Sequence, residues 1–119
     1  MVSLNDLIKI DGVAAAGRIT PDGKCADYKT NLDMSKDLAD KSAQYIATVT
    51  MLFNTLASAF SMESGMNWTP QQGWTYSGGD WTVVFWGDIA VFCQTEKTDM
   101  HELFNALESD VTSEIRAGM

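Results

Sequence analysis

The residues of this chain that could perform chemistry are few and scattered. It has one histidine, His101, and two cysteines, Cys25 and Cys93. Acid–base or nucleophilic catalysis needs a histidine placed beside a second reactive group, and zinc needs clustered Cys or His ligands. His101 stands alone in the first turn of an expected helix, and no carboxylate sits in a recognisable apolar pocket. We therefore expect no catalytic residue, no metal site and no cofactor.

The sequence also lacks the local motifs of common enzyme classes. It has no Gly-x-Ser-x-Gly elbow, no Walker A loop and no Gly-x-Gly-x-x-Gly after a strand. Cys93 falls in an expected central strand, where a free thiol packs as a small hydrophobic group. Cys25 begins a hairpin strand, and we expect it to be more exposed. A redox role for either thiol stays open, because it depends on a lowered pKa.

Charge and composition narrow the range of partners. Eight basic and sixteen acidic residues give a net charge of −8, which opposes binding to nucleic acid or to an anionic membrane. The amino terminus has neither the basic nor the apolar region of a signal peptide, so we expect a cytoplasmic protein with reduced thiols. The length of 119 residues, 45% of them hydrophobic, predicts a single domain over residues 1–119.

The segment from Ser42 to Met62 carries no charge. It is long enough to cross a bilayer, but a spanning helix would be more uniformly apolar. We therefore interpret it as part of a long helix in a soluble protein. Its polar residues are Ser42, Gln44, Thr48, Thr50, Asn54, Thr55, Ser58 and Ser61.

Helical periodicity divides this segment into faces. We expect the helix to begin at a cap on Ser35 or Asp33, to run to about Met62 and to end at Gly65. Two neighbouring apolar rows are expected to pack on a sheet. The remaining face has no charge after its first turns. This predicts that a second layer, from the same chain or another one, covers that face in addition to the sheet. The rows are Leu38, Tyr45, Val49, Leu52, Leu56 and Ala59, and Ala39, Ala43, Ile46, Phe53, Ala57 and Phe60.

Turn residues and alternating apolar residues predict the other elements. A short helix capped by Ser3 runs to about Ile8, and a last helix begins at Asp99 with an apolar stripe. That stripe is Met100, Leu103, Phe104, Leu107, Val111 and Ile115. Strands are predicted at 13–20, 25–29, 73–77, 81–86 and 89–95, with a type II′ turn at Gly87-Asp88.

Aromatic residues gather in the last three predicted strands and just before them. We interpret them as core residues, with a partner-binding surface as the alternative. They are Trp68, Trp74, Tyr76, Trp81 and Trp86.

The order of these elements resembles the roadblock/LC7 group of profilin-like domains. The resemblance rests first on Leu4-Asn5-Asp6-Leu7-Ile8 with Asp11-Gly12-Val13-Ala14-Ala15-Ala16-Gly17, and on the turn Pro21-Asp22-Gly23-Lys24. More narrowly, the chain resembles DUF2173, a bacterial and archaeal branch of unknown function. The segments that carry this narrower likeness are Gly65-Met66-Asn67-Trp68-Thr69-Pro70, Gly73-Trp74 and Ser77-Gly78-Gly79-Asp80.

The resemblance implies an α+β sandwich with a five-stranded antiparallel sheet in the order 2-1-5-4-3. The long helix would cover one face, and the first and last helices the other. Roadblock domains typically dimerise through their long helices and third strands. The implied interface residues, buried in a dimer and exposed on the helix of an isolated chain, are Gln44, Thr48, Met51, Leu52, Thr55, Ser58, Gly73, Trp74, Thr75 and Tyr76.

Two classes of function follow. Roadblock proteins serve as scaffolds or regulators, often of small GTPases or motor complexes, and contribute no catalytic residue. Our first hypothesis is therefore a non-enzymatic homodimer that docks onto a protein partner, such as a small GTPase or a larger complex. The alternative is a small-molecule sensor or carrier with a pocket lined by the aromatic residues. Because DUF2173 is associated with sulfur-metabolising prokaryotes, an accessory subunit of a redox complex is a further alternative.

Overall fold

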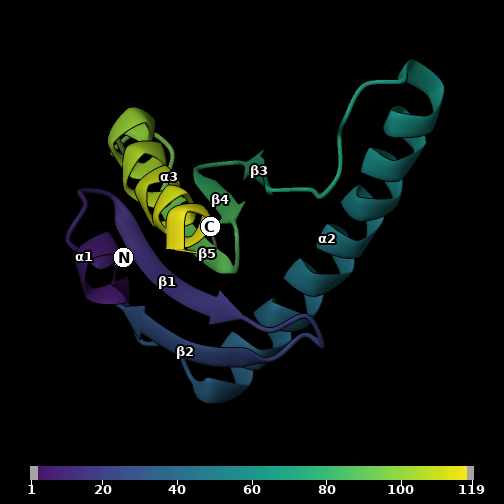
Figure 1. Ribbon diagram of the computed structural model, residues 1–119. Helices are drawn as coiled ribbons and strands as arrows, with labels where there is room; N and C mark the ends of the chain where they lie inside the picture. The colour runs from purple at the N-terminus through teal and green to yellow at the C-terminus, as the bar shows by residue number, and fades with distance from the viewer. Residues whose placement is uncertain (1–2, 118–119) are drawn as a thin grey trace.

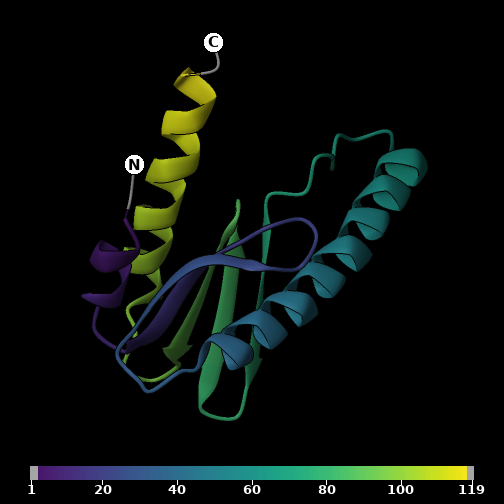
Figure 2. The same ribbon diagram turned by 90° about the horizontal axis from the view of Figure 1, so that it is seen from below.

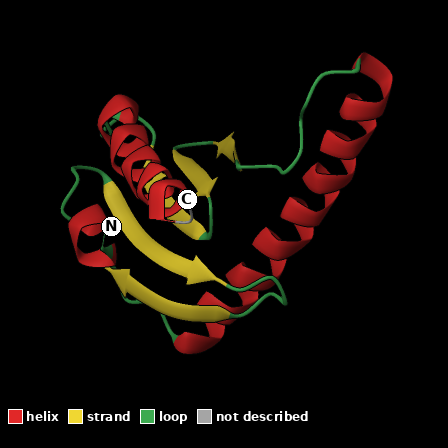
Figure 3. Ribbon diagram, viewed as in Figure 1, coloured by secondary structure: helices red, strands yellow, loops and turns green. Residues whose placement is uncertain are grey.

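A computed structural model describes residues 3–117 of the chain, and the side chains of residues 3–108 (Figure 1). The described residues form three helices and five strands, which Figure 3 colours red and yellow. Their bounds are α1 Leu4–Ile8, β1 Val13–Ile19, β2 Cys25–Thr30, α2 Lys36–Ser64, β3 Gly73–Gly78, β4 Trp81–Trp86, β5 Ile89–Gln94 and α3 Met100–Ala117.

The strands form one antiparallel sheet in the order β2-β1-β5-β4-β3, which confirms the expected topology. β2 and β3 are therefore the two edges. Helices α1 and α3 cover one face, and α2 lies on the other (Figure 2). Strands β4 and β5, which contain the apolar runs, are central strands of the sheet, as their lack of alternation predicted.

Local signals fix the ends of α2. The Ser35 hydroxyl accepts a hydrogen bond from the backbone N–H of Leu38 at 3.1 Å, so Ser35 rather than Asp33 is the cap. At the other end Gly65 has a φ of 72°, in the left-handed region that favours glycine. The helix continues to Ser64, slightly beyond the predicted end at Met62.

The β4–β5 hairpin has the predicted turn. Trp86 pairs with Ile89, which leaves two residues in the loop. Gly87 has a φ of 65°, and no residue type other than glycine has a positive φ in the described part of the chain. A positive φ at the first turn residue alone is the signature of a type II′ turn.

The main core lies between the sheet and helices α1 and α3. Leu7, Leu103 and Leu107 reach almost complete burial against Val91 and Cys93 of β5. Val111 and Ile115, the last members of the predicted stripe, lie outside the residues whose side chains are described. The smaller core beneath α2 is built on Ala39, Ala43, Ile46, Phe85 and Ala90.

Helix α2 differs from its prediction, because only one of its two apolar rows packs on the sheet. Ala39, Ala43 and Ile46 are buried, and from there the helix diverges from the strands (Figures 1 and 2). In the other row Leu52 is 65% exposed and only Val49 is half-buried. The expectation that both rows pack on the sheet is therefore wrong for the isolated chain.

Side-chain size gives the physical reason for this divergence. Alanines let the first turns of α2 approach the strands closely, whereas Trp74 of β3 lies between the helix and the sheet further along. Its indole ring is 6.0 Å from the ring of Phe53 on α2 and 5.9 Å from that of Phe85 on β4. This cluster of three tilted aromatic rings holds the distal part of α2 away from the strands.

By length and mean hydropathy alone, α2 would be able to cross a membrane. The first turns of the helix carry the ion pairs Lys36–Asp40 and Lys41–Asp37 and pack on the sheet. Further along, Thr50 accepts a hydrogen bond from Trp74. These contacts favour the interpretation of α2 as a helix of a globular domain.

Candidate interaction surface

The predicted interface residues on α2 are all exposed in the isolated chain, as expected. Met51, at 62% exposure, lies on a face that has no charge from Ser42 onwards. Between Lys41 and Asp80 the only charged residue is Glu63. An exposed, uncharged helix face of this length is typical of surfaces that become covered. Burial in a dimer stays a prediction for Gln44, Thr48, Met51, Leu52, Thr55 and Ser58.

The second part of the predicted interface is the edge strand β3. It pairs with β4 alone, in a regular register from Gly73 to Gly78. Proteins usually protect an edge strand with charged residues, proline or a bulge, and β3 has none of these. Gly73 and Trp74 are half-buried, while Thr75 and Tyr76 are exposed. The outer backbone groups of β3 are therefore available to pair with another strand.

The connection from α2 to β3 joins the two parts of this surface. The Gln71 side chain donates to the Thr50 carbonyl oxygen at 3.1 Å and to Asn54 Oδ1 at 3.3 Å. Trp74 Nε1 donates to Thr50 Oγ1 at 2.9 Å. The sequence did not point to Thr50 or Gln71, because their contact joins two distant segments. The distal half of α2 and strand β3 thus share one bonded framework.

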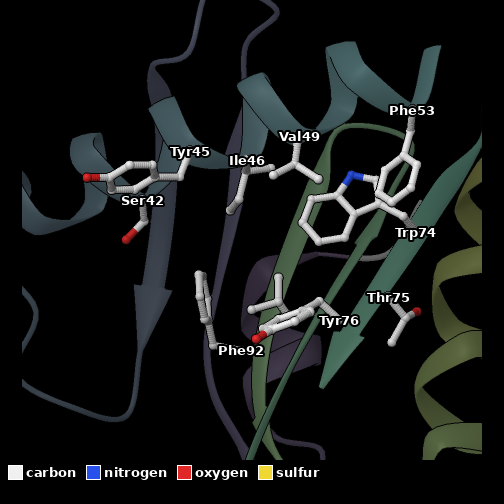
Figure 4. A pocket seen from close by; sticks show the side chains of 10 residues that line it. Ser42, Tyr45, Ile46, Val49, Phe53, Trp74, Thr75, Tyr76 and Phe92 are labelled. Carbon is white, nitrogen blue, oxygen red and sulfur yellow. The ribbon is translucent and has the colours of Figure 1, made fainter. Parts of the chain in front are cut away.

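The divergence of α2 opens an aromatic trough between the helix and the sheet (Figure 4). Its volume is about 410 Å³. Side chains of α2 form one wall, and side chains of β3, β4 and β5 form the floor. They are Ser42, Tyr45, Ile46, Val49, Phe53, Trp74, Thr75, Tyr76, Val83 and Phe92.

The five aromatic residues differ in burial, although all of them were expected to lie in the core. Trp86 packs against the core under α1 and α3, and Trp74 is half-buried in the cluster of three rings described above. Trp68, Tyr76 and Trp81 are exposed, so the core interpretation is wrong for these three. Trp68 contacts Phe60 near the end of α2, with 5.0 Å between the ring centroids. The alternative, that aromatic residues form a surface, describes Tyr76 and Trp81 better.

Both thiols are buried, which corrects the expectation for Cys25. Cys25 is 6% exposed and Cys93 is 0% exposed. Cys25 lies beneath the first turns of α2, where the Lys36 ammonium donates to its carbonyl oxygen at 3.3 Å. Desolvation is the main reason that the pKa of each thiol is raised. A raised pKa disfavours the thiolate and hence redox reactivity.

These pKa shifts predict that stability falls in alkaline solution. A thiol in the unfolded chain ionises near pH 8.5, about its ordinary pKa, whereas the folded state resists ionisation. The contribution to stability is therefore complete below that pH and is lost as the pH rises above it. Urea unfolding followed by circular dichroism should show a midpoint that falls between about pH 8 and 10.

The matched control replaces both thiols, as Cys25→Ala with Cys93→Ala. This variant is less stable overall but should show a smaller fall of the midpoint over the same pH range. Ellman's reagent should label neither thiol in the native protein and both after unfolding. Rapid labelling of Cys25 in the native state would contradict its burial.

The remaining candidate residues stay apart. His101 is exposed at the start of α3, and its backbone N–H donates to Asp99 Oδ1 at 3.0 Å. Within the described part of the chain, no three His, Cys, Asp or Glu residues come together as a potential metal site. The geometry therefore draws attention to the surface of α2 and β3 rather than to a reactive centre.

Solved structures share this fold at low sequence identity. The Roadblock/LC7 domain from Streptomyces avermitilis is similar, with a TM-score of 0.75 and 16% identity over 92% of this chain and 89% of that chain. The gliding protein MglB from Thermus thermophilus is also similar, with a TM-score of 0.68 and 14% identity over 87% of this chain and 76% of that chain. At such identities the likeness shows a common roadblock-like fold.

The sequence itself matches one family model. Residues 3–109 match DUF2173, which is described as an uncharacterised conserved protein. No functionally curated protein matches the sequence.

Proposed function

This chain belongs to the DUF2173 family of uncharacterised conserved proteins, and on that premise we propose that it works as a homodimer without enzymatic activity that docks onto a protein partner. The observation that carries the proposal is the exposed, uncharged surface of α2, joined through Thr50 and Trp74 to the unprotected edge of β3. We expect an exposed, uncharged surface of this kind to be buried against another protein chain.

The free energy gained by burying apolar side chains favours a second copy of the chain as the partner that covers α2. A monomeric soluble protein rarely exposes a large contiguous apolar surface, and the wide apolar arc of α2 leaves large side chains in water. Burying one exposed leucine or methionine contributes about 1.5–3 kcal/mol. In a two-fold symmetric interface each such residue contributes twice. Met51 and Leu52 alone therefore offer a substantial gain.

The edge strand offers directional contacts in the same region. Pairing β3 with its symmetry mate would satisfy the outer backbone groups from Gly73 to Gly78 and extend the sheet across the dimer. Two antiparallel edge strands pair naturally around a two-fold axis, since each presents the same groups to the other.

Resemblance to roadblock proteins supports a regulatory or scaffold role. Such proteins often act on small GTPases, which makes a small GTPase our first candidate for the partner. The buried thiols and the dispersed carboxylates favour a binding role over a catalytic one. We place this role in the cytoplasm, in keeping with two unpaired thiols.

Static light scattering on the purified protein tests the proposal. We expect a mass of twice the 13.1 kDa of the chain at micromolar concentration. A mass of 13.1 kDa throughout the micromolar range would overturn the homodimer.

A further inference from the structure

We infer that Met51 and Met62 of α2 form an oxidation-sensitive switch for the proposed homodimer. Hydrogen peroxide converts the two thioethers to sulfoxides and separates the two copies, and reduction of the sulfoxides lets the copies associate again. The inference rests on the proposed function, because it names a means of regulating the same surface.

The sulfur-containing side chains of the chain divide by burial. Both thiols are buried, and Met34 and Met100 are half-buried against the two cores. Three methionines are instead exposed in the isolated chain, Met51 at 62%, Met62 at 86% and Met66 at 63%. Because susceptibility to oxidation follows exposure, peroxide in solution meets these three thioethers before any other sulfur atom of the described residues.

Two of the three exposed methionines share one face of α2. Met51 and Met62 are eleven residues apart, which corresponds to about three helical turns and about 16 Å along the helix axis. Met66 follows Gly65, where the helix ends, and therefore lies off this face. The outer face of α2 thus carries two exposed thioethers, and the third serves as an internal reference.

The hydroxyl groups beside Met51 are already used within the helix. Thr48 Oγ1 donates to the carbonyl oxygen of Gln44 at 2.9 Å, and Thr55 Oγ1 donates to that of Met51 at 3.3 Å. No lysine or arginine lies between Ser42 and Met62. A sulfoxide oxygen on Met51 therefore adds an acceptor to a face whose nearest hydroxyl donors are engaged.

The chemical step is a two-electron oxidation that balances with hydrogen peroxide alone. A lone pair of the thioether sulfur attacks one peroxide oxygen, so that an S–O bond forms while the O–O bond breaks. The second oxygen leaves as water, the sulfur is oxidised and the peroxide is reduced. The apolar side chain becomes a polar and chiral one. No thiolate takes part, so the burial of both cysteines does not hinder the reaction.

This product weakens an interface that depends on apolar burial. A buried acceptor without a donor shifts an equilibrium by about tenfold. Because the proposed dimer has two-fold symmetry, each oxidised methionine enters the interface twice. Oxidation of Met51 alone therefore raises the dissociation constant by about 100-fold, and oxidation of Met62 adds to this effect.

Association and oxidation oppose each other at Met51. This side chain is exposed in the isolated chain and buried in the proposed dimer, so peroxide reaches it through the dissociated state. By linkage, oxidation then holds the chain in that state. In a fixed large excess of peroxide, Met51 should be oxidised more slowly in concentrated than in dilute protein. The oxidation rate of Met66 should be the same in both.

Peroxide treatment followed by sedimentation equilibrium tests the switch. Peptide mass spectrometry checks that Met51 and Met62 have become sulfoxides. The dissociation constant of the treated protein should be at least about 100-fold higher than that of the untreated protein, with an unchanged circular dichroism spectrum. Methionine sulfoxide reductases A and B, which each reduce one epimer, should restore the original constant when dithiothreitol is the reductant.

Two variants assign the effect to the face of α2. Met51→Leu combined with Met62→Leu keeps side chains of similar volume and removes the two sulfur atoms. Whatever its starting value, the dissociation constant of this variant should stay the same on peroxide treatment, although Met66 is oxidised. The matched control, Met66→Leu, removes an exposed thioether off the face, so peroxide should weaken its association as much as that of the unmodified protein.

Three outcomes would overturn the inference. An unchanged dissociation constant with Met51 and Met62 fully oxidised would show that the interface tolerates sulfoxides. Equal weakening of the double leucine variant would assign the effect to another group. Loss of the helical circular dichroism signal on treatment would show unfolding rather than dissociation.

The untreated sample separates this inference from the proposed function. A mass of 13.1 kDa before any treatment rejects the homodimer, and the switch with it. A dimer that persists through complete oxidation of Met51 and Met62 rejects the switch alone and leaves the homodimer standing.

Discussion

Replacing Met51 by lysine is expected to convert the proposed homodimer into monomers at micromolar concentration. Met51 is 62% exposed in the isolated chain and lies in the middle of the uncharged face of α2. Leaving an unpaired charge in a buried interface costs about 3–5 kcal/mol, and the two-fold axis places two such charges in it. We therefore expect the dissociation constant to rise at least about 100-fold, measured by sedimentation equilibrium.

The matched control for this variant is Ala26→Lys. Ala26 is also an exposed apolar residue, but it lies on β2, at the opposite edge of the sheet. The Ala26→Lys substitution should leave the dimer intact and keep the circular dichroism spectrum unchanged. A Met51→Lys protein that remains as dimeric as the Ala26→Lys protein would show that α2 is not the interface.

Replacing Trp74 by alanine should have the largest effect on the stability of the single chain. The indole contacts Phe53 and Phe85 and donates to Thr50, so it is the main link between the distal part of α2 and the sheet. Removal of a packed aromatic residue typically costs about 3–5 kcal/mol, and we expect the lower end because Trp74 is half-buried. Urea unfolding of the monomeric Met51→Lys background avoids the contribution of association.

Trp68→Ala is the control for this loss. Trp68 is also a tryptophan beside α2, but it is exposed and its only ring contact within the described residues is with Phe60. The Trp68→Ala substitution should lower the free energy of unfolding by less than about 1 kcal/mol, as surface substitutions usually do. Equal losses from the two variants would show that the cluster of three rings does not join α2 to the sheet.

Elements with local signals were predictable from the sequence. The cap at Ser35, the end of α2 at Gly65 and the turn at Gly87 each depend on a few adjacent residues, and all three are present. The element order carried the resemblance to roadblock proteins, and that resemblance supplied the sheet order, which the structure confirms. Strand ends differ by a residue at most, because the terminal residues of a ladder are weakly specified.

The position of α2 was not predictable in the same way. Periodicity identifies the residues that share a face, but it does not give the distance between that face and the sheet. That distance depends on Trp74, which follows the helix in sequence and lies between Phe53 and Phe85 in space. The burial of Cys25 has a similar origin, because the start of α2 folds back over the start of β2.

The candidate surface was therefore predictable only in part. The absence of charge marked the outer face of α2, and exposure of that face in the isolated chain agrees with it. The trough was not foreseen, because both apolar rows were expected to pack on the sheet. Its floor contains Val83 and Phe92, which are typical core residues by type and face the trough only because the helix diverges.

The two edges of the sheet are unequal, and this inequality would limit an assembly built by pairing sheet edges. Strand β3 is uncharged, whereas β2 exposes Asp27 and Lys29 along the opposite edge. Once two β3 strands have paired, each end of the extended sheet is a β2 strand whose charges disfavour further pairing. If the proposed dimer forms through β3, growth should therefore stop after a single step, and the same contact should not propagate into a filament.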